Sequence, residues 1–212
     1  MIAWLRRSGR LGGLAAALVF GHAVLLDPAL ATAATAAAET RCEVRGFATD
    51  RDPKGSNIRS QPRANAPVIG HLPPRFPLTD ADIVGAEFEI IGSKNGWLLI
   101  RNAEIVVDKQ GNGKRVFNGP GWISGGLAGA TLGSQFLRAQ PRRDAAIVAN
   151  LIDAQKGWGP DSFAVRRIHS CQGDFVEVTA SPPVGPNERR VLVRGWSARP
   201  CSNQLTTCDR GE

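Results

Sequence analysis

The sequence predicts an all-β fold, and three observations lead to this prediction. First, 14 prolines and 24 glycines interrupt the 212-residue chain, and no amphipathic helical period persists for three turns. Second, short apolar runs alternate with turn residues, which is typical of sandwiches and barrels made of short strands. Third, one segment occurs twice, which indicates two copies of one small unit.

The repeated segment aligns without a gap. Residues 58–72 (IRSQPRANAPVIGHL) match residues 137–151 (LRAQPRRDAAIVANL). The identical pairs are Arg59/Arg138, Gln61/Gln140, Pro62/Pro141, Arg63/Arg142, Ala66/Ala145 and Leu72/Leu151. Further landmarks follow in the same order in both copies, ending at Gly121-Trp122 and Gly195-Trp196. Self-similarity of this kind predicts that both copies fold alike.

The sequence pattern also predicts a β-hairpin in each copy. In residues 87–100 (EFEIIGSKNGWLLI), two apolar runs flank Asn95-Gly96, a strong signal for a tight turn. Residues 164–178 (AVRRIHSCQGDFVEV) repeat this pattern around a turn that contains glycine. Long inserts at 102–120 and 180–194 then precede the final strand of each copy, and we expect them to be extended hairpins or loops.

One segment is also compatible with a helix. Residues 144–151 have a composition that suits one or two helical turns, but their counterpart, 65–72, contains Pro67. Because a shared fold must suit both copies, a strand is predicted in each.

The N-terminus predicts a cleavable export signal over residues 1–38. Arg6 and Arg7 precede an apolar stretch, and small residues follow as far as Ala38. Cleavage is expected after Ala38, with earlier small residues as other options. A retained membrane anchor is the alternative, but the apolar stretch is shorter than the roughly 20 residues that span a bilayer. We therefore expect no stable membrane span after cleavage and a periplasmic or secreted location.

The net charge narrows the class of partner. The chain carries 26 basic and 19 acidic residues, and removing residues 1–38 takes away three Arg and one Asp, which leaves +5. A mildly basic protein favours anionic surfaces such as cell-wall polymers. Nucleic acid is not a predicted partner, because no run of Lys and Arg is interleaved with aromatic residues.

Four cysteines follow the predicted signal: Cys42, Cys171, Cys201 and Cys208. An even number in an exported protein predicts two disulfides. The short loop between Cys201 and Cys208 favours that pair, with Cys42 and Cys171 as the second, although two other connectivities stay open. Zinc is not predicted, because there is no Cys-x-x-Cys pair. No other cofactor is predicted.

The order of motifs resembles the bacterial SH3-like (SH3b) family. The resemblance rests on residues 57–62 (NIRSQP), 68–72 (VIGHL), 95–100 (NGWLLI) and 121–123 (GWI), and it extends over roughly residues 42–201. It implies two tandem small SH3-like β-barrels, a first domain at 39–127 and a second at 130–212 with a cysteine-bearing tail. The second copy departs from the pattern, since it has Asp-Phe where the first has Gly-Trp.

The candidate ligand-binding residues are aromatic and basic. They are Trp97, Trp122, Trp158, Arg59 and Arg138. Large rings in small barrels often anchor the core instead, and this is the alternative for Trp97 and Trp122. Trp158 lies between glycines and is expected to be the most exposed of them.

No catalytic residues are predicted. Only His71 and His169 follow the signal, and the chain has no tyrosine. The cluster His169-Ser170-Cys171 is the one hint of a nucleophilic site, but Cys171 is better used in a disulfide. The resemblance therefore implies a non-catalytic module that binds cell-wall peptide or an envelope protein. A structural subunit of an envelope complex is the alternative, and a small hydrolase or hydrolase accessory ranks last.

Overall fold

The computed structural model describes residues 40–108, 112–184 and 191–208. The predicted signal at 1–38 lies outside these residues. The all-β prediction is confirmed: the described residues contain strands and two 3-10 turns, η1 (Gly125–Leu127) and η2 (Pro160–Ser162), but no α-helix. Among these residues there is accordingly no helix that could cross a membrane.

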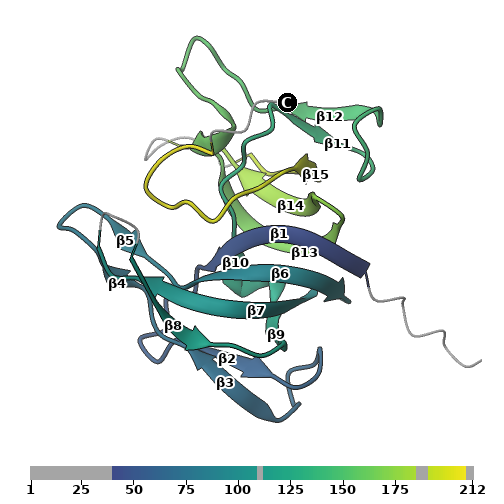
Figure 1. The fold of residues 1–212 in the computed structure, drawn as a ribbon. Helices are drawn as coiled ribbons and strands as arrows, with labels where there is room; N and C mark the ends of the chain where they lie inside the picture. The colour runs from purple at the N-terminus through teal and green to yellow at the C-terminus, as the bar shows by residue number, and fades with distance from the viewer. Residues whose placement is uncertain (1–39, 109–111, 185–190, 209–212) are drawn as a thin grey trace, which may run out of the picture. The chain divides into compact units, whose positions relative to one another are not determined.

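Fifteen strands fall into two halves that share the repeat (Figure 1). The first half contains β1 (Thr40–Ala48), β2 (Ser56–Arg59), β3 (Val68–Leu72), β4 (Phe76–Pro77), β5 (Ile83–Val84), β6 (Glu87–Lys94), β7 (Trp97–Val106), β8 (Gly113–Phe117), β9 (Gly121–Ser124) and β10 (Ala128–Gly129). The second half contains β11 (Phe136–Arg138), β12 (Ile147–Asn150), β13 (Ala164–Gln172), β14 (Phe175–Ser181) and β15 (Val193–Ala198).

The two halves have one strand order. The first sheet runs β10-β1-β6-β7-β9-β2-β3, with β8 on β7, and the second runs β13-β14-β15-β11-β12. The five strands β6-β7-β9-β2-β3 therefore correspond one by one to the second sheet. The register agrees too, because Trp97 pairs with Ser124 in the first half as Phe175 pairs with Ala198 in the second. The sequence repeat is a structural repeat.

The same arginine hydrogen bond occurs at the start of each repeat. Arg59 Nη1 donates to the carbonyl of Ala66 over 2.8 Å, and Arg138 Nη1 donates to the carbonyl of Ala145 over 3.0 Å. Each arginine also sits at a shift in strand register, between β2 and β3 or between β11 and β12. The identical Arg and Ala of the repeat thus fold the β2–β3 and β11–β12 connections in one way.

The predicted hairpins are confirmed. β6 and β7 join through Asn95 and Gly96, both with positive φ, and β13 and β14 join through Gly173-Asp174. A strand, β12, replaces the possible helix in the second copy. The first insert forms an extended hairpin, since β7 continues to Val106 and pairs with β8.

Strand pairing among the described residues closes neither sheet. The first sheet ends at β10 and β3, and the second ends at β12 and β13. The expected closed barrels are therefore not seen in the hydrogen bonding, because the outer strands of each sheet have no pairing with one another. The SH3-like identity of the two units stays a prediction.

The described residues form one compact unit with one hydrophobic cluster. Equivalent residues of the repeat contribute to it from both halves, including Ile58 and Leu72 from the first and Leu137 and Leu151 from the second, all fully buried. Units of this size bury little surface alone, so a shared cluster adds to the stability of both.

Both predicted disulfides are present. Cys42–Cys171 joins β1 to β13 across 129 residues, and Cys201–Cys208 closes a short C-terminal loop. The backbone of Gly173 adds two hydrogen bonds to β1, from Glu43 N and to Arg41 O. The N-terminal strand is thus fastened to the second half.

Hydroxyl groups fill the space beside the first disulfide. Ser93 Oγ accepts from the backbone N–H of Cys171 over 3.0 Å, and it lies 2.6 Å from Thr40 Oγ1 and 2.9 Å from Ser170 Oγ. Ser93 is buried, so these bonds satisfy a polar group that would otherwise be costly to bury.

We predict that Gly125→Ala destabilises the protein by about 1–3 kcal/mol. A Cβ atom placed on Gly125 would lie 1.9 Å from the carbonyl oxygen of Ile168 in the second half, so one half must shift. Gly126→Ala is the matched control, because its Cβ would meet only ordinary contacts, from 3.7 Å. Urea unfolding measures both, and equal midpoints would contradict the close packing of the halves.

We predict that removing the long-range disulfide costs more stability than removing the local one. A loop of 129 residues corresponds to about 5 kcal/mol of chain entropy, and a separation of 7 to about 2 kcal/mol. The test compares denaturant unfolding of Cys42→Ala/Cys171→Ala with that of Cys201→Ala/Cys208→Ala. A larger loss of stability in Cys201→Ala/Cys208→Ala would contradict the role assigned to the Cys42–Cys171 disulfide.

Candidate functional site

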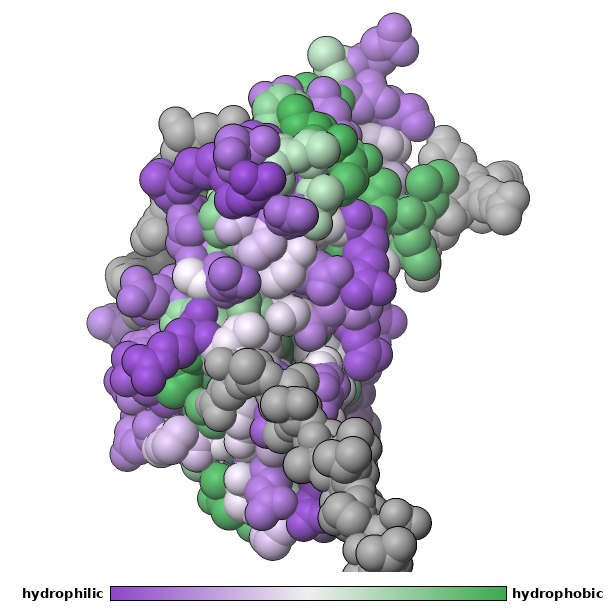
Figure 2. Space-filling view, turned by 90° about the vertical axis from the view of Figure 1, so that its right-hand side faces the viewer, coloured by the Kyte–Doolittle hydropathy of each residue, from purple (hydrophilic) through white to green (hydrophobic). Residues whose placement is uncertain are grey.

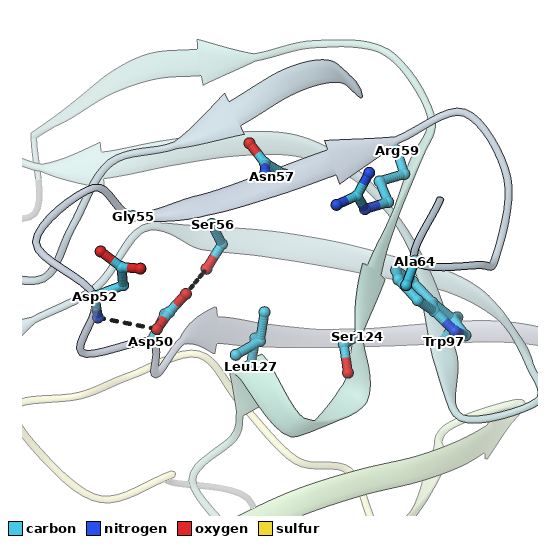
Figure 3. Close-up of a pocket in the computed structure, with 10 residues that line it drawn as sticks. All are labelled: Asp50, Asp52, Gly55, Ser56, Asn57, Arg59, Ala64, Trp97, Ser124 and Leu127. Atoms are coloured by element: carbon cyan, nitrogen blue, oxygen red, sulfur yellow. Dashed lines mark hydrogen bonds between the residues drawn. The ribbon is translucent and has the colours of Figure 1, made fainter. Parts of the chain in front are cut away.

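A pocket of about 250 Å³ lies in the first half, beside β2 (Figure 3). Its walls combine carboxylates, a guanidinium, an indole and small polar groups. The lining residues are Asp50, Asp52, Gly55, Ser56, Asn57, Arg59, Ala64, Trp97, Ser124 and Leu127. We call this pocket the first-half groove.

The loop between β1 and β2 places two carboxylates at one end of the groove. Asp50 accepts hydrogen bonds from Ser56 Oγ over 2.7 Å and from the backbone N–H of Asp52 over 3.0 Å. Asp52 accepts from the backbone N–H of Lys54 over 2.8 Å. Gly55 then turns the chain at φ +72° into β2. These local bonds hold both acids in place before the strand begins.

The alternation of β2 places the basic group. Ser56 and Ile58 are buried, whereas Asn57 is exposed and Arg59 half-buried on the other side of the strand. One N–H of the Arg59 guanidinium is used by Ala66, and the group offers four more donors. Figure 3 shows Arg59 and Trp97 lying away from the two acids.

The aromatic wall comes from the hairpin. Trp97 is the first residue of β7, directly after the tight turn, and it is half-buried. Its strand partner is Ser124, which also lines the groove. The hairpin therefore presents part of the indole to the groove and leaves it accessible.

A second guanidinium approaches from the other half of the protein. A Cβ atom placed on Gly96 would lie 3.3 Å from Arg167 Nη2, and one on Gly126 would lie 3.8 Å from Arg167 Nη1. Gly96 precedes Trp97, and Gly126 lies between Ser124 and Leu127. The exposed Arg167 of β13 thus lies close to two glycines that adjoin lining residues of the groove, although it does not line the groove itself.

The equivalent place in the second half carries different side chains. The repeat puts Arg143 where the first half has Ala64 and Phe175 where it has Trp97. The Arg143 guanidinium lies 6.0 Å from the Phe175 ring centroid and pairs with Asp174 over 3.0 Å. Arg138, the counterpart of Arg59, lies 5.6 Å from the Phe136 ring centroid. The two copies therefore differ at this place: an alanine stands beside the aromatic residue in the first and an arginine in the second.

The structure separates the candidate residues that the sequence suggested. Arg59 and Trp97 line the groove together, whereas Arg138 holds the corresponding place in the second half. Trp122 is buried at 8% exposure. Trp158 is half-buried, with Lys156 Nζ 4.3 Å from its ring centroid and Phe163 edge-on at 6.5 Å. Trp158 and Trp97 are therefore both half-buried, and Lys156 and Phe163 cover part of the Trp158 ring.

Sequence reasoning missed Asp50, Asp52, Ala64 and Arg167. One signal could have found Ala64: in the gapless repeat it aligns with Arg143, a much larger and charged residue. No comparable signal marks Arg167, since its place depends on how the two halves pack.

The residues considered for nucleophilic chemistry have structural partners. Cys171 Sγ is bonded to Cys42 and is not a free thiol. His169 Nε2 shares a 2.8 Å hydrogen bond with Thr179 Oγ1. Within the described part of the chain, no cluster of His, Cys, Asp and Glu is arranged to hold a metal ion.

Comparison with known proteins adds no relative: no protein-family model, curated protein or solved structure shows significant similarity to the chain.

We predict that stability falls on acidification, and that His169 causes part of the loss. Burial lowers the pKa of His169 below 6.5, and Arg194 lowers it further. The unfolded chain therefore binds the proton first, so this stability is present above about pH 6.5 and is lost as the pH falls below it. Unfolding midpoints measured from pH 7.5 to 5 should depend less on pH in His169→Gln. An unchanged pH dependence would contradict this assignment.

Glu89 contributes in the same direction at lower pH. The hydrogen bond from Arg101, 2.6 Å long, is the main cause that lowers the pKa of this carboxyl below 4.5. Its contribution is present above that pH and is lost as the carboxylate becomes protonated.

Proposed function

We propose that the chain is an exported, non-catalytic binding protein of the bacterial envelope, made of two SH3-like units. Its ligand is a cell-wall peptide or a peptide segment of an envelope protein, bound in the first-half groove. The observation that carries this proposal is the difference between the copies. One strand order and one register are kept, yet the first half has a pocket lined by Ala64 and Trp97, whereas the second half has Arg143 beside Phe175.

Three further features support the proposal. Two disulfides fit an oxidising compartment outside the cytoplasm, in agreement with the export signal that residues 1–38 predict. The five-strand order shared by both halves fits two copies of a small β unit. The groove is polar with an aromatic wall, and such sites orient peptide groups through a few fixed hydrogen-bonding partners.

We predict that purified peptidoglycan retains the protein and that Ala64→Arg releases it. The new side chain would enter the groove that Ala64 lines, without changing the buried core. Trp97→Ala should also weaken retention, by roughly tenfold or more, because a partly buried indole is a typical dominant contact. Sedimentation with purified sacculi, followed by quantification of bound and free protein, measures both.

Two control variants make the test specific. Arg143→Ala and Trp158→Ala alter the second half and should leave retention unchanged, provided that circular dichroism shows both to be folded. Full recovery of the unaltered protein in the unbound fraction would rule out the wall ligand. If sacculi retain Ala64→Arg as well as they retain the unaltered protein, the groove is not the binding site.

One observation favours a structural subunit as the second candidate. The free edge strands β3 and β12 carry matched exposed apolar pairs, Val68-Ile69 and Ile147-Val148, each about half exposed. Exposed edge strands can pair with another chain. In the face drawn in Figure 2, apolar side chains form separate patches among polar ones. Native mass spectrometry of envelope extracts would identify a stable partner, and an exclusively monomeric protein would exclude this function.

A further inference from the structure

We propose that the first-half groove binds a short zwitterionic peptide, with its amino group at Asp50 and Asp52 and its carboxylate at Arg59 and Arg167. This inference rests on the proposed function and specifies the ligand of the same site. It follows from the separation of opposite charges within one pocket and from the length of β2 between them.

The charges are separated and fixed. Asp50 and Asp52 are held by hydrogen bonds from Ser56 and from the loop backbone, and among the described ion pairs neither acid is joined to Arg59. Arg59 is held by the carbonyl of Ala66 at the other end of β2. Opposite charges kept apart in a pocket do not neutralise each other, so a ligand with both charges gains at each end.

The separation suits about three residues of peptide. Asp50 is bonded to Ser56, and the Cα atom of Arg59 lies three residues further along β2, about 10 Å at the usual rise of a strand. Ser56 and Arg59 face opposite sides of β2, so this length is that of the backbone between the two ends, not of the gap between the charged atoms. An extended peptide spans about 3.3 Å per residue, so a tripeptide reaches from one end to the other. Figure 3 shows the side chains of the groove arranged along this direction.

A second guanidinium lies near the carboxylate end. Arg167 lies beside Gly96, which precedes Trp97, and beside Gly126 of the 3-10 turn after Ser124. In the second half the turn residue equivalent to Gly96 is Asp174, whose carboxylate pairs with Arg143 and Arg199. The counterparts of these two arginines in the first half are Ala64 and Gly125, so the first half has neither this acid nor its two partners. The guanidiniums near its turn are instead Arg59 and Arg167, and we assign the carboxylate of the ligand to them.

The other members of the groove fit the middle of such a peptide. Trp97 provides an apolar surface for a side chain, and Ser124 Oγ, which accepts a hydrogen bond from the backbone N–H of Gly126, keeps its own O–H as a donor. Neither residue adds charge, so the selectivity comes from the two ends.

The test is a calorimetric titration of protein expressed from the full-length sequence with trialanine and its two blocked forms. We expect free trialanine to bind, and N-acetyl-trialanine and trialanine amide each to bind roughly tenfold more weakly, because each loses one charge-assisted contact. Equal affinity for the three peptides, or no binding at millimolar concentration, would overturn the proposal.

Two substitutions identify the ends. Asp52→Asn should abolish the preference for a free amino group while the preference for a free carboxylate remains. Arg167→Gln should do the reverse. The matched controls are Asp144→Asn and Arg142→Gln, which break an exposed ion pair in the second half and should leave both preferences unchanged. Loss of both preferences in one variant would contradict separate subsites.

The result can be distinguished from a failure of the proposed function. If sacculi retain the protein through Trp97 but the three peptides bind equally, the groove does not select a zwitterionic peptide, and the proposed binding function stands. If trialanine binds selectively but sacculi do not retain the protein, the groove chemistry stands and the wall ligand is wrong.

Discussion

The packing of the two halves into one hydrophobic core is the constraint on which the rest of the structure depends. Neither five-strand unit is large enough to bury much surface alone. Side chains from equivalent positions of both copies therefore meet in one cluster, and Gly125 lets η1 approach the Ile168 carbonyl closely. The Cys42–Cys171 disulfide and the Gly173 backbone fasten the same contact. As a result Arg167 of the second half lies close to Gly96 and Gly126 of the first.

The two copies share residues that fold the chain and differ at a position that lines the groove. Arg59 and Arg138 make the same hydrogen bond to the same alanine, and the buried leucines at the ends of both repeats are identical. Ala64 and Arg143, by contrast, lie on exposed turns where either side chain is compatible with the backbone. Exchange at such a position alters binding with little cost to stability.

Much of the fold could be predicted from the sequence, because it depends on local signals. Proline and glycine excluded long helices, Asn95-Gly96 indicated a hairpin, and the gapless repeat indicated two similar units. Sheet closure could not be predicted, since it depends on hydrogen bonds between outer strands that are distant in sequence.

The candidate site was predicted in part. Arg59 and Trp97 stood out by residue type, whereas Asp50 and Asp52 resemble the acids of any solvated loop. The exposure of Trp158 could not be predicted, because the contacts of its ring with Lys156 and Phe163 are set by the folded structure.

The C-terminal loop has a consequence for how the protein is made. Gln204 bonds both the N–H and the carbonyl of Gly85, and Ser202 donates to Glu87, so this loop completes an edge of the first half. The first half therefore lacks these contacts until residues 202–204, which follow the whole second copy, have been synthesised. The first copy consequently cannot complete its folding before the second copy has been made.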